Sequence, residues 1–170
     1  MSTRPIFLLS SRNAPSQRAH FGIFVPLAVD PHRGTLINVV GAPMMGYGLI
    51  FQRNYMPATT GHDELVPIGS VACDHIVDTS ASGTASEDST PRGTLEILAA
   101  QVPPPRISEN FMAPVNDTTN KRCQEWTMEY LRHLVKKGII GAGAIEVVQS
   151  KRDSPTHGIG LQSVLNRVEL

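Results

Sequence analysis

Apolar runs in the first half of the chain have the length and the bordering turn residues of β-strands. Short runs rich in branched and aromatic residues, separated by Gly, Pro, Asn or Asp, are typical of strands. The pattern predicts strands over residues 6–10, 20–29, 35–40, 47–55 and 65–77. A turn at 31–34 joins the second run to the third, so we expect these two strands to form a hairpin.

The second half of the chain contains one strong helical pattern. Its apolar residues recur at the spacing of a single helix face and end at a glycine: Trp126, Tyr130, Leu131, Leu134, Val135 and Gly138. Residues that commonly cap helices precede the pattern, namely Thr118, Thr119 and Asn120. We therefore expect one long helix that carries Cys123 at its N-terminus.

The other segments have weaker patterns. Residues 78–93 are rich in Ser, Thr, Gly and Asp, which is typical of a flexible surface loop. Residues 94–102 fit a short strand or helix, residues 144–148 fit a final strand, and a weakly ordered tail begins at about 150. We expect a single domain over residues 1–170, of the α+β class, with an antiparallel sheet packed against the long helix.

Composition narrows the functional classes. The chain has 170 residues, of which 41% are hydrophobic, enough for a buried core. It carries 15 Lys and Arg and 15 Asp and Glu, so nothing indicates a nucleic-acid surface. No apolar run reaches the length of a membrane span, and the N-terminus lacks a signal-peptide pattern. We expect a cytoplasmic protein with no stable membrane insertion and leave its oligomeric state open.

Cys123 is the strongest candidate for chemistry. The positive end of a helix dipole favours the thiolate, and Lys121 and Arg122 add positive charge. A thiolate is the form that attacks electrophiles. Two alternatives stay open: a buried structural thiol, and a single bridge to Cys73, although two cysteines are too few for a disulfide framework.

His20 is the best candidate for a base that serves this thiol. It begins an apolar run, and the start of a strand is a rigid place for an imidazole. Asn38 lies in the middle of an aliphatic strand, where an unpaired amide would cost about 1–3 kcal/mol. We therefore expect Asn38 to hydrogen-bond to the imidazole of His20 on the neighbouring strand.

The order of these segments resembles a circularly permuted papain-like fold, the group that includes the lecithin:retinol acyltransferase-like proteins. The resemblance is carried by the histidine strand at 19–25, the Gly-Thr-Leu strand at 34–41 and the Arg-Cys-Gln-Glu-Trp sequence at 122–126. In the permuted group the histidine strands precede the cysteine helix, as they do here. The chain is also similar to small uncharacterised proteins of filamentous fungi that share these segments.

The resemblance implies that Cys123 is a nucleophile, His20 its general base and Asn38 the residue that orients the base. Acyltransferase-like members usually have a histidine at the third position, so Asn38 is a departure from their pattern. The predicted substrate-binding residues are Gln124, Trp126 and Tyr47, with Gln124 also a candidate oxyanion donor.

These residues predict a cysteine-dependent hydrolase or acyltransferase that acts on an amide, ester or thioester of a small molecule or short peptide. The mechanism needs no metal and no cofactor. The similarity to fungal proteins suggests natural-product tailoring. The alternatives are a non-hydrolytic cyclase or isomerase on the same scaffold, and a binding protein without catalytic activity.

Overall fold

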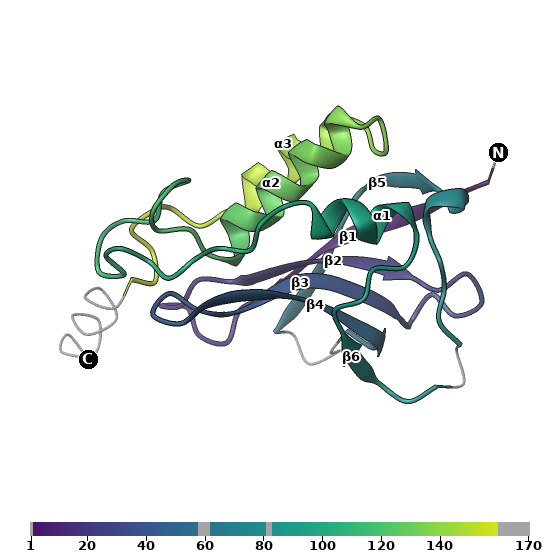
Figure 1. The fold of residues 1–170 in the computed structure, drawn as a ribbon, viewed down its shortest axis with the longest axis horizontal. Coiled ribbons are helices and arrows are strands. Elements are labelled where there is room, and N and C mark those ends of the chain that lie inside the picture. The colour runs from purple at the N-terminus through teal and green to yellow at the C-terminus, as the bar shows by residue number, and fades with distance from the viewer. Residues whose placement is uncertain (1, 58–61, 81–82, 160–170) are drawn as a thin grey trace.

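The computed structural model describes residues 2–57, 62–80 and 83–159. A six-stranded antiparallel sheet forms one layer, and α-helices cover one of its faces (Figure 1). The predicted α+β class and antiparallel sheet are confirmed. The prediction of a single long helix is wrong, because the described residues form three α-helices.

The first strands follow one another as a meander, and the fifth returns to pair with the first. The strands are β1 (Thr3–Ser11), β2 (His20–Pro26), β3 (Gly34–Ala42), β4 (Gly46–Tyr55), β5 (Asp63–Ala72) and β6 (Ser86–Asp88). Their order in the sheet is β5-β1-β2-β3-β4-β6. The predicted hairpin of the second and third strands is present. The predicted strand at 65–77 ends at Ala72, after which Cys73–His75 form a short 3-10 helix, η1.

Strand alternation divides the apolar residues between the two faces of the sheet. The strand residues of the main core, which also contains the helices' apolar residues, include Ile6, Leu8, Phe21, Ile23, Ile37, Val39 and Phe51. On the other face Leu9, Phe24 and Leu36 form a smaller buried cluster. The central strands β2 and β3 are therefore buried on both faces, which explains their nearly continuous apolar sequences.

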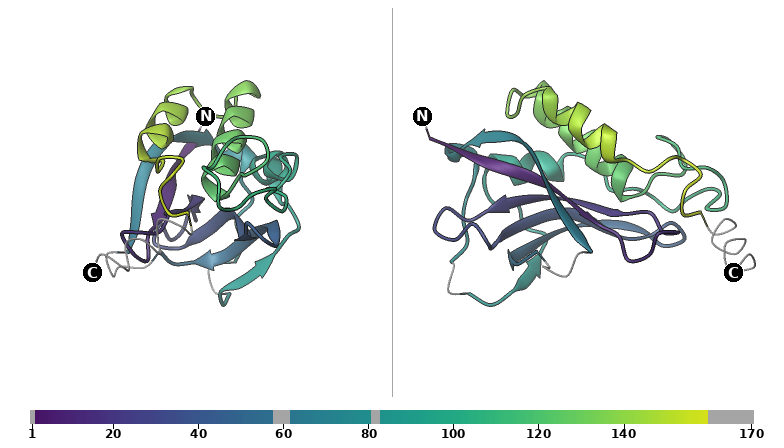
Figure 2. Two further views of the ribbon diagram at one scale, coloured as in Figure 1. Left: turned by 90° about the vertical axis from the view of Figure 1, so that its left-hand side faces the viewer. Right: turned by 180° about the vertical axis from the view of Figure 1, so that it is seen from behind.

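The helices are α1 (Gly93–Ala100), α2 (Cys123–Lys136) and α3 (Gly143–Lys151). The strand predicted at 144–148 is wrong: a short apolar run does not distinguish a strand from one buried side of a helix. α2 packs on β2 and β3, and both other helices contact α2. Figure 2 shows that the sheet curves toward the helices, so the main core lies between the two layers.

α2 begins at Cys123, but its cap differs from the predicted ones. Arg122 is the N-cap residue, and its backbone N–H donates to Oε1 of Glu125 at 3.0 Å. Asn120 is instead buried in the preceding turn, where its amide bonds Ser108 and the carbonyl oxygens of residues 113 and 114. The helix closes at Gly138, whose φ of 73° suits a glycine after a helix end.

β6 lies inside the segment that we predicted to be a surface loop, and one buried arginine anchors it. Arg53 of β4 is 2% exposed and forms a two-pronged ion pair with Glu96 of α1, at 2.6 and 2.8 Å. It also bonds both carboxylate oxygens of Asp88 in β6 and lies over the ring of Phe51. One guanidinium group thus joins two strands to a helix.

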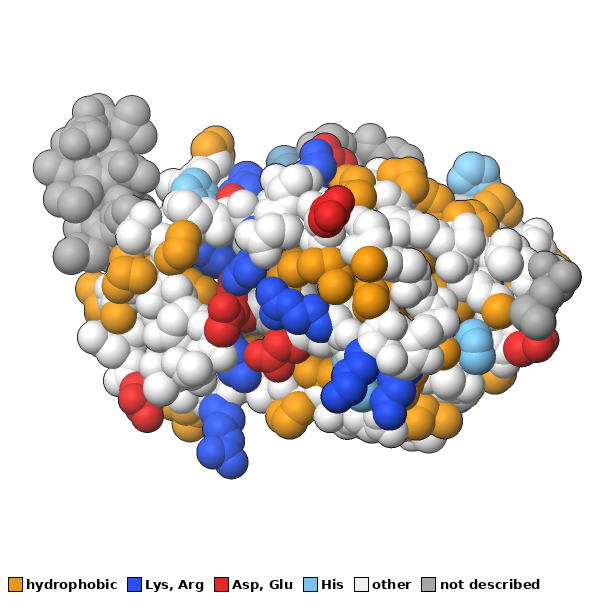
Figure 3. All heavy atoms as spheres, turned by 90° about the horizontal axis from the view of Figure 1, so that it is seen from above, with side chains coloured by type: hydrophobic (Ala, Val, Ile, Leu, Met, Phe, Trp, Pro, Cys, Tyr) orange, Lys and Arg blue, Asp and Glu red, His pale blue; other side chains and the backbone are white. Residues whose placement is uncertain are grey.

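Seen from the helix side, basic and acidic side chains lie next to one another across the middle of the molecule (Figure 3). Within the described residues, no helix is long and apolar enough to cross a membrane. Part of the predicted weakly ordered tail, residues 152–159, packs against the loop that precedes β2. The rest of that tail, 160–170, lies outside the described residues.

We predict that Arg53→Met destabilises the fold by about 3–5 kcal/mol, because it leaves the carboxylate of Glu96 buried without its partner. The matched control is Arg92→Met: Arg92 is 46% exposed and lies 3.7 Å from Asp88. Its loss should cost less than about 1 kcal/mol. Urea unfolding measures both, and equal effects of the two substitutions would contradict the role given to Arg53.

Candidate active site

The candidate site lies where two central strands separate. β2 begins at His20 and β3 runs to Ala42, yet their pairing covers only Ile23–Pro26 of β2 and Gly34–Ile37 of β3. Both strands lie wholly within the described residues. The first residues of β2 therefore have no strand partner on the β3 side, and the start of α2 docks there.

A cavity of about 510 Å³ occupies this opening. Its lining comes from the loop before β2, from β2, β3, β4 and the start of α2: Gln17, Arg18, Ala19, His20, Val39, Val40, Gly41, Pro43, Tyr47, Arg122, Cys123 and Gly158. The structure thus brings Cys123, His20 and Tyr47, all predicted from the sequence as site residues, to one cavity.

Cys123 is a free, half-buried thiol, so the alternative of a bridge to Cys73 is excluded. Its Sγ donates a hydrogen bond to the carbonyl oxygen of Ala19 at 3.8 Å. The backbone N–H of Phe21 also interacts with the sulfur. The thiol is therefore held against the main chain of β2, on both sides of His20.

The predicted low pKa of Cys123 is wrong in direction. Burial raises the pKa of the thiol and the charge of Glu125 adds to this, while the N–H of Phe21 and the charge of Arg18 oppose it. The helix start does not overcome this desolvation. Lys121, which we expected to favour the thiolate, is paired with Glu129 at 3.0 Å. The resting cysteine is a protonated thiol.

His20 and Asn38 form the contact that we predicted, with 3.0 Å between Nε2 and Nδ2. The Asn38 amide also donates to Oε1 of Gln52 on β4 at 3.1 Å. Gly22 leaves the space for this arrangement, because a Cβ at that position would lie 3.3 Å from Cβ of Asn38 and 2.7 Å from Leu36.

The imidazole and the thiol reach the cavity from different faces of the sheet. His20 and Asn38 share the face of Leu36, whereas Cys123 packs against the main core on the helix side. Among the described residues, no hydrogen bond joins Cys123 to His20. Burial lowers the pKa of His20, only partly offset by the charge of Asp63, so the imidazole is neutral at pH 7.

Gln124 fixes the position of the thiol. Its amide nitrogen donates to the carbonyl of Ala19 at 3.0 Å and to Asp153 at 2.8 Å, and its oxygen accepts from Arg18 and from the N–H of Asp153. The side chain is 0% exposed. The structure leaves this amide no free group for a substrate or an oxyanion, so the predicted binding role of Gln124 is not supported.

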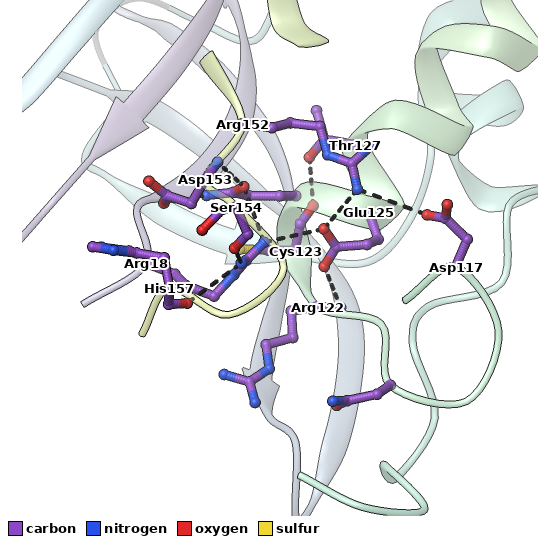
Figure 4. Close-up of polar contacts among 12 residues, drawn as sticks. Arg18, Asp117, Arg122, Cys123, Glu125, Thr127, Arg152, Asp153, Ser154 and His157 are labelled. Atoms are coloured by element: carbon purple, nitrogen blue, oxygen red, sulfur yellow. Dashed lines mark hydrogen bonds and ion pairs between the residues drawn. The ribbon is translucent and has the colours of Figure 1, made fainter. Parts of the chain in front are cut away.

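Glu125 completes this polar cluster and is also fully buried. Its Oε2 accepts from Arg18 at 3.1 Å and from Arg152 at 2.9 Å, so that its carboxylate lies between two guanidinium groups (Figure 4). Figure 4 also shows the side chain of Arg122 extending away from Glu125. A double ion pair on one buried carboxylate thus ties the start of α2 to the loop before β2 and to the chain after α3.

The remaining predicted binding residues differ in position. Trp126 is 1% exposed, donates its indole N–H to the carbonyl of Val102 and stacks on Tyr130, so it is a core residue and not a cavity wall. Tyr47 does line the cavity. Burial raises the pKa of Tyr47 to about 12, so its phenol is a hydrogen-bond donor at neutral pH.

Some residues of the site had no signal in the sequence pattern. Asp153 lies in what we predicted to be a weakly ordered tail, yet it accepts from the N–H of Ala19 and from Arg12. Gln52 also gave no signal, because Arg53 and Asn54 follow it, so it does not stand out in its strand as Asn38 does among aliphatic residues. Within the described residues, no group of three or more His, Cys, Asp or Glu could hold a metal ion.

Comparison with known families places the chain without assigning it an activity. Residues 6–141, which include the strands of the candidate site and the whole of α2, match the family of unknown function DUF6540. The chain belongs to this family. No curated protein and no solved structure matches it significantly. For this DUF6540 chain, a function must therefore be argued from the cavity itself.

We predict that alkylation of Cys123 by iodoacetamide keeps accelerating with pH beyond the free-thiol pKa of about 8.5, because burial raises the pKa of this thiol. Peptide mapping by mass spectrometry separates Cys123 from Cys73, and N-acetylcysteine is the reference. A labelling rate that reaches its plateau below pH 8 would show a stabilised thiolate and contradict the assignment of a protonated resting thiol.

Proposed function

We propose that this protein is a cysteine-dependent hydrolase or acyltransferase that acts on an amide, ester or thioester of a small molecule or short peptide. The observation that carries the proposal is the shared cavity, in which Cys123 and His20 both line the opening between β2 and β3. The hydrogen bond from Asn38 to His20 supplies the third member of a Cys-His-Asn site.

The pKa shifts favour general-base catalysis over a resting ion pair. A raised thiol pKa and a lowered imidazole pKa leave both groups neutral at pH 7. In the proposed reaction Cys123 Sγ rotates away from the Ala19 carbonyl and attacks the substrate carbonyl carbon. Its proton passes to His20 through one water in the cavity, because the two side chains reach the cavity from different faces of the sheet. The imidazolium then returns this proton to the leaving amine, alcohol or thiol. Water or another acceptor resolves the acyl-enzyme.

The base role sets a requirement on Asn38. As oriented, its Nδ2 faces Nε2 of His20, and its Oδ1 is buried with no hydrogen-bond partner among the described residues. To leave Nδ1 free to accept a proton, Nε2 must carry the hydrogen and Oδ1 must face it. Oxygen and nitrogen of an amide have nearly the same shape, so a 180° turn of the Asn38 amide meets this requirement. The Gln52 amide must then turn as well, because its Oε1 now accepts from Nδ2 of Asn38 and would otherwise face Oδ1.

The order of the segments supports the proposal from a second direction. A histidine strand, a second central strand and a late cysteine helix are the arrangement of the permuted papain-like scaffold that we propose for this chain. The backbone N–H of Cys123, at the helix start, would contribute to an oxyanion hole. On this proposal the enzyme tailors a small natural product.

The principal rival is a binding protein that uses the same cavity without chemistry. The hydrogen bond of Sγ to Ala19 favours this reading, because it occupies the thiol within the fold. A cyclase or isomerase on the same scaffold would also bind its substrate here and need no acyl-enzyme. Covalent trapping by an acylating probe separates both rivals from the proposed enzyme.

We predict that Cys123→Ala abolishes hydrolysis across a panel of p-nitrophenyl esters and thioesters, and that His20→Ala lowers kcat/KM by about 10²–10⁴-fold. Cys73→Ala is the matched control because Cys73, the other cysteine, lies in η1 and does not line the cavity. Intact-mass analysis should show an acyl adduct on the wild type and on Cys73→Ala only. Full activity in Cys123→Ala would refute the nucleophile.

We predict that Asn38→Asp moves the acid limb of the pH profile of kcat/KM to higher pH. In the wild type the limb should lie below about 6.5, because burial lowers the pKa of His20 and the base must be neutral. A carboxylate in place of the amide favours the imidazolium, so it raises the pKa of His20. A pH–rate profile of kcat/KM checks this. Gln52→Glu is the comparison, because it places a carboxylate next to Asn38 and not next to His20. An unmoved limb in Asn38→Asp would exclude His20 as the base.

A further inference from the structure

Positively charged side chains line the cavity at Cys123, and one of them has no ion-pair partner among the described residues. Its charged or titratable lining residues include Arg18, Arg122 and His20, and among the described residues that line it none is Asp or Glu. The two Nη atoms of Arg18 donate hydrogen bonds to Gln124, to Glu125 and to backbone carbonyls. Arg122 forms no ion pair within the part of the chain that the structure describes.

Two buried donors of these arginines have no partner. Nε of Arg18 and Nε of Arg122 are both inaccessible to solvent and unbonded in the described structure. The Arg18 side chain is only 7% exposed, so this donor is removed from bulk water. A buried donor without a partner costs about 1–3 kcal/mol, and an acceptor in the cavity could recover this only after the arginine side chain shifts to expose the donor.

The charge of Arg122 is likewise not compensated by a carboxylate partner among the described residues. Burial lowers its pKa and the charge of Arg18 lowers it further, while Tyr47, Glu125 and Cys123 oppose this. Nη2 of Arg122 donates a hydrogen bond to the carbonyl of Phe111 at 3.0 Å. A guanidinium held close to a second cation, without a carboxylate of its own, is a site for one negative charge.

An apolar hollow continues from the same place. Tyr47 lines both the cavity and an adjoining open hollow of about 530 Å³, which is also lined by Met45, Pro105 and Ile107 and by one charged residue, Arg106. Met45 is 80% exposed and Ile107 63% exposed. A ligand bound at the arginines therefore has an apolar surface beside it.

We propose that the cavity at Cys123 selects compounds that carry a carboxylate group, which the guanidinium of Arg122 binds, and that an apolar part of the ligand lies along Met45 and Ile107. The proposal names the substrate class of the proposed enzyme and rests on the same site. Of the arginines that line the cavity itself, Arg18 is paired with Glu125 and Arg122 has no ion pair among the described residues, so the cavity offers one free positive charge, which matches a monoanion better than a doubly charged phosphate. The Tyr47 phenol is a second donor to the carboxylate.

The test measures occupancy of the cavity and does not need turnover. Octanoate and octanamide share the apolar tail and differ in charge, so protection of Cys123 from iodoacetamide compares them directly. We expect octanoate to half-protect Cys123 at a concentration at least about 10-fold lower than octanamide, since charge-assisted hydrogen bonds are roughly twice as strong as neutral ones. Peptide mapping reads Cys123 separately from Cys73.

Arg122→Gln should remove this preference, so that both compounds protect equally. Arg132→Gln is the matched control: Arg132 lies on α2 and is exposed, and its loss should leave the preference intact. Circular dichroism confirms that each variant is folded. Equal protection by the two compounds on the wild type, or an unchanged preference in Arg122→Gln, would overturn the proposal. Octanoate protection without any hydrolytic activity would instead support carboxylate binding while refuting the proposed enzyme.

Discussion

The site depends on how the start of α2 docks onto the unpaired edge of β2. A helix start and an open strand edge both expose main-chain groups that need partners when they are buried. Gln124 and Glu125 supply them: Gln124 donates to the carbonyl of Ala19, and Glu125 accepts from the N–H of Arg122. Asp153, brought in by the chain after α3, accepts from the N–H of Ala19. Because every group of Gln124 is bonded, the helix has one position relative to the strand.

The position of Cys123 follows from this docking, since it directly precedes Gln124 and its sulfur lies against the same carbonyl. The docking also explains why the thiol is protonated. Arg18 and Arg152 share the buried carboxylate of Glu125, and Arg152 also lies 3.7 Å from the carboxylate of Asp117, so both cations have acidic partners. The largest influence on the thiol is therefore desolvation, which raises the pKa of Cys123. The unneutralised charge belongs to Arg122, at the wall of the cavity.

Period-two and period-3.6 patterns predicted most of the architecture. The central strands were found because β2 and β3 are buried on both faces and their sequences are almost entirely apolar. The contact of His20 with Asn38 was predictable for a related reason: a polar side chain within such a strand must find a partner. The segment at 144–148 was mistaken for a strand because its few apolar residues fit either period, and only packing against α2 decides for the helix.

The sequence by itself determined the strand runs, the long amphipathic helix and the residue types available for chemistry, because these follow from local periodicity and side-chain identity. Tertiary structure decided which of those residues can act. Gln124 and Trp126 were candidates on sequence, and burial commits both to the fold. Cys123 was expected to be a thiolate, and desolvation makes it a thiol. The ion pairs of Glu125 join it to Arg18, 107 positions earlier, and to Arg152, 27 positions later, and no local pattern in the chain encodes either pairing.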